Sequence, residues 1–202
     1  MKKWLLFFLI LSIFSCGGEG SKDSVNTPIS GVRHFRMGFT PWLYAATSTA
    51  QDEIFGFIEG NADLMAIHLD GGVPWPEAFT ANNFDNYGSG VKSEVAGLVT
   101  RLSGMTNKTI YLAVSPFNSL RDGKAQYWNV STGESLPSPW DSLQFNSDFV
   151  VAAYFNYLDE LIKKFDPTYV NYAVEINEYY HNVPGDIVNL QYFFVNLYSL
   201  LK

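Results

Sequence analysis

The sequence has one cysteine and three histidines in 202 residues. One cysteine excludes a disulfide framework, and three widely spaced histidines argue against a zinc site. Neither a phosphate-binding loop nor a dinucleotide fingerprint is present, so we expect no metal and no cofactor. Basic residues are also few, at 13 against 20 acidic residues, for a net charge of −7. With no long basic run, we expect no nucleic-acid partner and favour neutral or cationic ones.

Apolar residues are abundant, at 47% of the chain, and aromatic residues make up 16%. This length and apolar content predict one globular domain with a sizeable core, and they exclude a disordered or fibrous protein. Much of the aromatic share lies in segments that have the composition of loops. Such aromatics either pack the loops or form an interaction surface.

The amino terminus has the pattern of a signal peptide. Lys2 and Lys3 precede an apolar segment, residues 4–14, which is too short to span a bilayer permanently. The only cysteine, Cys16, follows directly after residues 1–15 and resembles the lipid-modified cysteine of a bacterial lipobox. We therefore expect residues 1–15 to be a lipoprotein signal peptide and Cys16 to carry a membrane anchor. An ordinary secretory peptide with a leftover cysteine is the alternative.

Residues 16–31 are rich in Gly, Ser, Asp and Asn and show no apolar period. This composition predicts a flexible tether between the lipid anchor and a domain at residues 32–202. The resemblance to lipoproteins implies a location in the bacterial cell envelope, lipid-anchored at the outer membrane or the cell surface.

From residue 35 onward, short apolar runs alternate with longer helical patterns, which is typical of a parallel sheet covered by helices. We expect strands at residues 36–40, 63–69, 109–115 and 169–177, and helices at 50–59, 90–103, 148–165 and 186–201. The predicted fold class is therefore α/β.

The four strand-helix units average about 42 residues each, so eight would give about 336 residues, within the range of the (β/α)8 barrel. We therefore expect a parallel (β/α) barrel of which the chain holds only the first four units, a half-barrel from a truncated TIM barrel. Four strands alone leave two sheet edges open, which is a costly exposure. A complete small α/β sandwich is the alternative.

In such barrels the chemistry lies at the carboxyl ends of the strands. The period of the fourth predicted strand places Glu175 and Asn177 on its polar, inward face, and Glu178 follows at the barrel mouth. Two carboxylates beside an amide suit glycoside cleavage, which needs a proton donor for the leaving oxygen and a group that binds sugar hydroxyls.

The run 174–179, Val-Glu-Ile-Asn-Glu-Tyr, resembles the glycoside hydrolases of clan A, whose fourth strand ends in an Asn-Glu pair. The resemblance implies that Glu178 is the acid/base and that Asn177 binds substrate. The clan's nucleophile is a second Glu at the end of strand seven, beyond these four units. Glu175 is an alternative proton donor, because the strand period directs it inward. In the competing interpretation, these glutamates are simply solvent-exposed residues at the rim and have no catalytic role.

Polar and aromatic residues at the ends of the other strands complete the predicted site. His68 and Asp70 share the inward face of the second strand, where they could hold sugar hydroxyls or tune the acid, or where the histidine could simply be bonded within a polar interior. Arg121 could bind hydroxyls or carboxylates, or form a structural ion pair with its neighbour Asp122.

Four tryptophans follow the first three predicted strands, and residues 116–145 form a 30-residue loop of the length usual for functional loops. Aromatic rings stack on the apolar faces of sugars, so tryptophans at the mouth predict a sugar-binding platform; packing within the loops is the alternative. The tryptophans concerned are Trp42, Trp75, Trp128 and Trp140.

Together these features predict an extracytoplasmic, glycoside hydrolase-like lipoprotein acting on a polysaccharide or oligosaccharide, with the acid/base at the end of strand four. A non-catalytic carbohydrate-binding surface lipoprotein is the alternative, and a structural envelope lipoprotein is a third. Whether the chain is an enzyme depends on whether the full-length protein supplies the strand-seven carboxylate.

Overall fold

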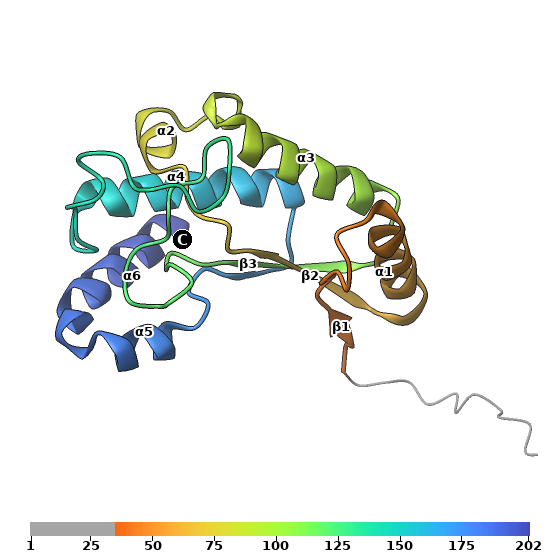
Figure 1. Ribbon diagram of the computed structural model, residues 1–202. Coiled ribbons are helices and arrows are strands. Elements are labelled where there is room, and N and C mark those ends of the chain that lie inside the picture. The colour runs from red at the N-terminus through yellow and green to blue at the C-terminus, as the bar shows by residue number, and fades with distance from the viewer. Residues whose placement is uncertain (1–34) are drawn as a thin grey trace, which may run out of the picture. The chain divides into compact units, whose positions relative to one another are not determined.

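A four-stranded parallel sheet runs through the computed structural model, which describes residues 35–202 (Figure 1). The strands lie side by side in chain order, and each pairs in parallel with the next. The strands are β1 (Gly38–Phe39), β2 (Leu64–Leu69), β3 (Thr109–Val114) and β4 (Tyr169–Asn171). The predicted α/β class and the order of its parallel strands are thus confirmed. The predicted signal peptide, tether and lipidated Cys16 lie outside the described residues.

Helices follow every strand, directly or after a loop. They are α1 (Ser48–Asn61), α2 (Trp75–Thr80), α3 (Ser89–Ser103), α4 (Asp148–Phe165), α5 (Ile176–Asn182) and α6 (Ile187–Leu201), with short 3-10 turns at Phe84–Asn86 and Pro184–Asp186. The four long helices were expected from their apolar periodicity. The short helices α2 and α5 were not, because six or seven residues carry too little periodic signal.

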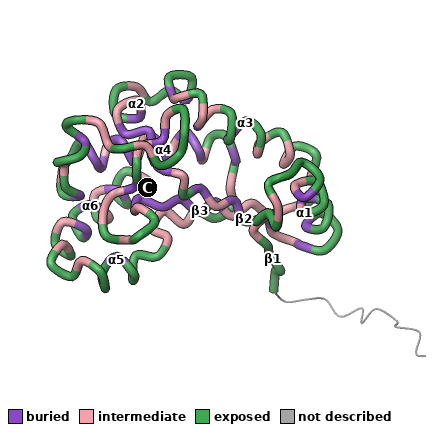
Figure 2. The backbone as a smooth tube through the Cα atoms, viewed as in Figure 1, coloured by how far each residue is buried: buried purple, intermediate pink, exposed green. Residues whose placement is uncertain are grey.

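The two faces of the sheet differ in burial. Along β2, Met65, Ile67 and Leu69 are buried, whereas Ala66 and His68 between them are only partly buried. Figure 1 shows α3 and α4 along one side of the strands, and Figure 2 shows the buried backbone concentrated along β2, β3 and α4. The apolar face of the strands therefore meets the helices, as a half-buried alternating pattern predicts.

The described strands do not close into a barrel. The sheet has two edges, β1 and β4, which pair only with β2 and β3. Beyond β4, helix α6 leaves large apolar side chains exposed along one face, namely Val188, Tyr192, Val195 and Tyr198. The structure therefore shows a four-stranded parallel α/β fold with an unpartnered apolar helix face.

Strand four is shorter than predicted, which corrects the placement of the candidate carboxylates. It ends at Asn171, whose side-chain oxygen accepts a hydrogen bond from the backbone N–H of Ala173 at 3.1 Å. Such a local side-chain bond competes with the strand ladder. Glu175 then adopts a left-handed backbone (φ 60°), and α5 begins at Ile176. The period-two face assignment for residues 172–177 is therefore wrong.

The segment after β4 is tied to the end of β3 through the core. The hydroxyl of Tyr154, on α4, shares its single proton between two acceptors, the carbonyl oxygens of Val114 at 3.1 Å and Tyr172 at 3.0 Å. Tyr154 is fully buried, and that burial raises the pKa of its hydroxyl. This contact holds the end of β3 next to the residue that follows β4. It therefore also positions the starts of the two loops that carry the candidate site.

Between residues 35 and 202, no helix has both the length and the apolar character needed to cross a bilayer.

Candidate functional site

The candidate site begins with a tight turn that follows β3. The backbone N–H of Asn118 donates to the carbonyl of Gly123 at 3.0 Å, which closes the turn. The Asn118 side chain also bridges it, accepting from the Asp122 N–H at 3.1 Å and donating to the Asp122 carboxylate at 2.7 Å. Arg121 lies inside this turn with a left-handed backbone (φ 54°). The turn therefore presents Arg121 from a position fixed by Asn118.

Arg121 reaches across to the segment after β4 and binds Glu175. Its Nε and Nη2 each lie 2.6 Å from Oε2 of Glu175, and its Nη1 donates to the carbonyl of Asn118. The arginine side chain is 11% exposed and the glutamate side chain 52%. The expected alternative of an ion pair with Asp122 is wrong, because the turn directs the guanidinium to Glu175. Glu175 is thereby held in an ion pair through its Oε2, and Glu178 is the candidate carboxylate outside that pair.

Glu178 and Asn177 lie in the first turn of α5, and both side chains are exposed. The Asn177 amide donates to Oε1 of Glu178 at 2.9 Å. The predicted Asn-Glu pair is thus a contacting pair, although it stands on a short helix rather than on the strand. The Glu178 carboxylate is therefore accessible to a ligand from solvent, and it could exchange a proton with that ligand.

Tyr179 anchors this short helix. Its buried ring stacks on Phe117 with centroids 4.6 Å apart, and its hydroxyl donates to Asp186 at 2.6 Å. Burial, reinforced by the bond to the Asp186 carboxylate, raises the pKa of the Tyr179 hydroxyl. Asn182 adds two bonds from α5 to the carbonyl oxygens of Leu120 and Arg121, at 3.0 and 3.2 Å. The helix that carries Glu178 is therefore held against the turn that carries Arg121.

His68 and Trp42 meet at the ends of β2 and β1. Their rings are nearly parallel, at 29°, with centroids 6.3 Å apart, and Trp42 is 72% exposed. The Nε2 atom of His68 is buried and has no hydrogen-bond partner in the described part of the chain. His68 is aligned with Ala113, which is aligned with Asn171, so all three share one face of the sheet. Asp70 is exposed just beyond the strand.

Three of the four candidate tryptophans are core residues. Trp75, Trp128 and Trp140 are 0%, 3% and 5% exposed, and Trp75 stacks on Trp140 with centroids 6.0 Å apart. The indole N–H of Trp75 bonds the carbonyl of Ala125 at 2.9 Å, so its polar atom is satisfied inside the protein. The predicted exposed platform is therefore wrong for these three, and only Trp42 can offer a ring to a ligand.

These tryptophans pack where the loops after β2 and β3 join. The N–H of Val73 donates to the carbonyl of Gln126 at 2.9 Å, and the N–H of Trp128 donates to the carbonyl of Val73 at 3.2 Å. Gly72 makes this approach possible: its φ is 130°, and a Cβ there would lie 2.5 Å from the Gln126 oxygen. The long loop is thus built into the core.

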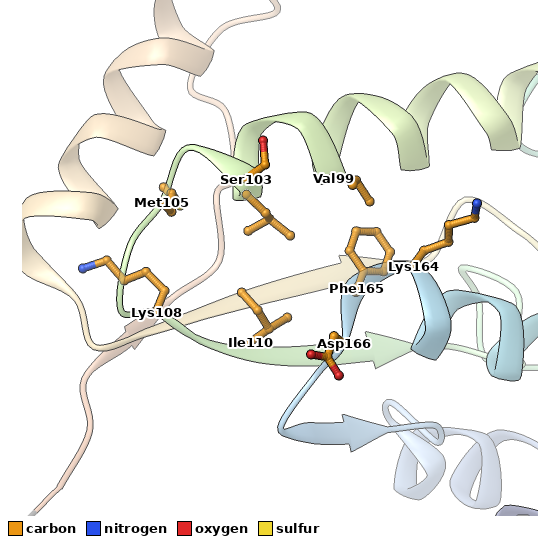
Figure 3. Close-up of a pocket in the computed structure, with 9 residues that line it drawn as sticks. Val99, Ser103, Met105, Lys108, Ile110, Lys164, Phe165 and Asp166 are labelled. Atoms are coloured by element: carbon orange, nitrogen blue, oxygen red, sulfur yellow. The ribbon is translucent and has the colours of Figure 1, made fainter.

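A pocket of about 350 Å³ lies at the opposite end of β3, toward the strand's amino end (Figure 3). It is framed by the last turns of α3 and α4, with Lys108, Ile110 and Asp166 among its lining residues. Because Arg121 and Glu178 follow the carboxyl ends of β3 and β4, this pocket is separate from the candidate site.

Asn118, Tyr179 and Asp186 were missed in the sequence analysis. These residues hold the site in place but lie outside the Asn-Glu motif or contribute no candidate catalytic group. Asn118 had a local signal, because Asn opening a turn that ends in Asp-Gly is typical of side-chain-bridged turns. The Tyr179–Asp186 bond had none, because it depends on how α5 folds back. Within residues 35–202, no cluster of three or more His, Cys, Asp or Glu residues could hold a metal ion.

Comparisons of the chain with protein-family models, curated proteins and solved structures found no match.

Proposed function

We propose that this chain is the amino-terminal half of a (β/α)8-barrel glycoside hydrolase that acts on a polysaccharide or oligosaccharide outside the cytoplasm. The observation that carries the proposal is the gathering of Arg121, Glu175, Asn177 and Glu178 just beyond the carboxyl ends of neighbouring parallel strands. Barrel enzymes place their catalytic groups at that end.

The open edges of the sheet support the barrel part of the proposal. Four parallel strands in chain order with long intervening helices are the arrangement of the first half of an eight-stranded barrel. The exposed apolar face of α6, which includes Val188 and Val195, is where a further strand-helix unit would pack. Later units would also cover the strand face that carries His68.

The roles follow from the contacts. Glu178 has an open side and acts as the acid/base, while Asn177 holds its carboxylate and can bind a sugar hydroxyl. Arg121 fixes Glu175, and the resulting ion pair forms one side of the mouth. Trp42 offers its exposed ring for stacking, with His68 behind it. The nucleophile or base would be the strand-seven carboxylate of the complete barrel.

Cys16 would hold this domain at the bacterial cell envelope through a lipid, with residues 16–31 as the tether. Metabolic labelling with a palmitate analogue in a bacterial host tests the anchor. The wild-type protein should take up label and Cys16→Ala should not. Equal labelling of the two would rule the anchor out.

The function is tested by incubating the longest natural form of the protein with a panel of polysaccharides and measuring new reducing ends. Wild type should release sugar from at least one glycan, and Glu178→Gln should not. The alternative, a carbohydrate-binding lipoprotein, draws support from Trp42, whose exposed ring could bind a glycan without any cleavage. Glycan binding through Trp42 with no reducing ends released would select that alternative.

A further inference from the structure

The exposed ring of Trp42 has a single ring partner in the described part of the chain. That partner is His68, and the indole N–H of Trp42 has no acceptor among the described residues. The segment around Trp42 is held separately, because the hydroxyl of Tyr44 donates to the carboxylate of Glu53 on α1. The backbone is thus anchored by other residues, and the direction of the indole depends on His68.

His68 stands on a well-paired part of the sheet. It lies in β2, aligned with Ala113 of β3, and Ala66 precedes it on the same face. Both alanines carry only a methyl group, so neither can support a ring in place of His68. β1 pairs with β2 over two residues only, and the chain has therefore left the sheet before it reaches Trp42.

The two rings form an offset stack that leaves one indole face open. Their centroids are 6.3 Å apart and their planes are inclined by 29°, within the range of about 4.5–7 Å for aromatic pairs. One face of the indole is therefore directed at His68. Because Trp42 is 72% exposed, the opposite face is open to solvent. A ring whose direction is fixed before binding loses less entropy when a ligand arrives.

The Nε2 atom of His68 decides between two roles for this histidine. The atom is buried and has no hydrogen-bond partner within residues 35–202. A sugar hydroxyl cannot reach a buried atom, so Nε2 does not hold one. A histidine that served the fold by hydrogen bonding would have this nitrogen paired, as buried polar groups generally are. The contact of its ring with Trp42 is the role that remains.

We propose that His68 is a positioning residue that sets the direction of Trp42, whose outer face then stacks on the apolar C–H face of one pyranose residue. The choice of a sugar rests on the proposed function, in either its hydrolase or its carbohydrate-binding form. His68 does not touch the sugar and acts only through Trp42. The ring of residue 68, rather than its nitrogens, is therefore what binding requires.

Fluorine NMR of the full chain labelled with 5-fluorotryptophan tests the contact without any ligand. The resonance that disappears in Trp42→Phe belongs to Trp42. In His68→Gln this resonance should move to the position of a freely exposed fluorotryptophan, and in His68→Phe, which restores a ring, it should stay displaced. Unchanged resonances of the buried Trp75, Trp128 and Trp140 show that a variant is folded. A Trp42 resonance that is the same in folded His68→Gln and in wild type would overturn the proposal.

Binding of oligosaccharides to the longest natural form of the protein tests the role of the contact. The probes are cellohexaose, mannohexaose, xylohexaose and galactohexaose. For a probe that wild type binds, His68→Gln should weaken binding by about two- to tenfold, the contribution of one aromatic pair. His68→Phe should restore most of the affinity.

A double-mutant cycle separates positioning from direct contact. In a Trp42→Ala background, His68→Gln should weaken binding no further, because His68 acts through the ring that is already gone. An equal loss with and without Trp42 would mean that His68 contacts the sugar itself, and the proposal would be wrong. Phe149→Ala is the matched control, because it removes a half-exposed ring from its pair with Phe79, 4.9 Å away, and leaves Trp42 and His68 untouched.

The kinetics of a protein that cuts glycans give a further readout. His68→Gln should raise KM and leave kcat unchanged, because a stacking platform binds substrate and transition state alike. Glu178→Gln should instead lower kcat.

The outcomes separate this proposal from the proposed function. If the protein binds or cuts a glycan with the same affinity or KM in His68→Gln as in wild type, the positioning role fails alone. If His68→Gln weakens binding only when Trp42 is present and no glycan is cut, the positioning role stands and the hydrolase proposal fails. If wild type neither binds nor cuts any glycan, the proposed function fails and the role of His68 in sugar binding fails with it.

Discussion

Arg121 and Glu175 lie 54 residues apart in the chain, yet Nε and Nη2 of the arginine both lie 2.6 Å from Oε2 of the glutamate. Both residues have left-handed backbones, with φ of 54° and 60°. Residues other than glycine adopt that conformation at a cost, so the ion pair joins two strained points of the chain. It links the turn after β3 to the start of α5 and thereby sets the position of Glu178.

Removing the arginine head should therefore destabilise the protein modestly. We expect Arg121→Met to lower the free energy of unfolding by about 1 kcal/mol, the upper range for a partly exposed pair. Urea unfolding measures the change, and Glu94→Gln, which removes an exposed charge on α3, is the comparison. High salt should reduce the difference between Arg121→Met and wild type. Identical urea midpoints would show that the pair contributes nothing to holding the loops.

The tryptophans should divide into structural and ligand-facing residues. Trp75→Ala empties a fully buried site, so it should cost about 3–5 kcal/mol of unfolding free energy. Trp42→Ala should change stability by no more than about 0.5 kcal/mol, because the side chain is largely exposed. In glycan binding by the folded proteins, only Trp42→Ala should lose affinity. A large loss of stability in Trp42→Ala would contradict this division.

Tyr179 should make the protein sensitive to alkali. Burial and the bond to Asp186 raise its pKa above the ordinary value near 10 in the folded state. The stabilisation is therefore complete below pH 10 and is lost as the pH rises from 10 toward the folded pKa. Urea unfolding at pH 8 to 11 should show a steeper alkaline decline for wild type than for Tyr179→Phe. Parallel curves for the two proteins would contradict the assignment.

The exposed face of α6 should make the isolated chain self-associate. Val195 is one of several exposed apolar residues on that helix, so Val195→Lys should shift sedimentation velocity profiles toward the monomer. Val130→Lys offers a matched control, because Val130 is similarly exposed but lies on the long loop. A wild-type chain that is monomeric at high concentration would show that α6 needs no partner.

The parts of the fold that the sequence predicted well are those with a clear period. Helix α4 begins and ends at the predicted residues, because its apolar face repeats over five turns and Asp166-Pro167 ends it. The strands β2 and β3 were predicted to within a residue, since each is a short, mainly apolar run that follows a helix and ends at a polar loop. Strand four was extended too far because the apolar alternation continues past Asn171, where a side-chain bond ends the strand.

The candidate site was predictable only in part. Glu175, Asn177 and Glu178 do lie beyond the end of β4, but their directions depend on the left-handed Glu175 and on α5, which no period reveals. Trp75 was predicted to be exposed but is buried. The loops after β2 and β3 pack against each other through backbone hydrogen bonds, and such packing cannot be predicted from loop composition.

The central claim is that Glu178 donates the proton in glycoside cleavage, and the dependence of rate on leaving group tests it most directly. In the longest natural form of the protein, Glu178→Gln should lower turnover of a glycan with a poor leaving group by roughly 10² to 10⁴-fold, the usual contribution of general acid catalysis. An activated aryl glycoside, which needs little protonation, should be affected far less. Glu175→Gln should show no such difference between the two substrates. If Glu175→Gln shows the leaving-group dependence and Glu178→Gln does not, the two roles are exchanged; if neither change affects hydrolysis of any glycan, the claim is wrong.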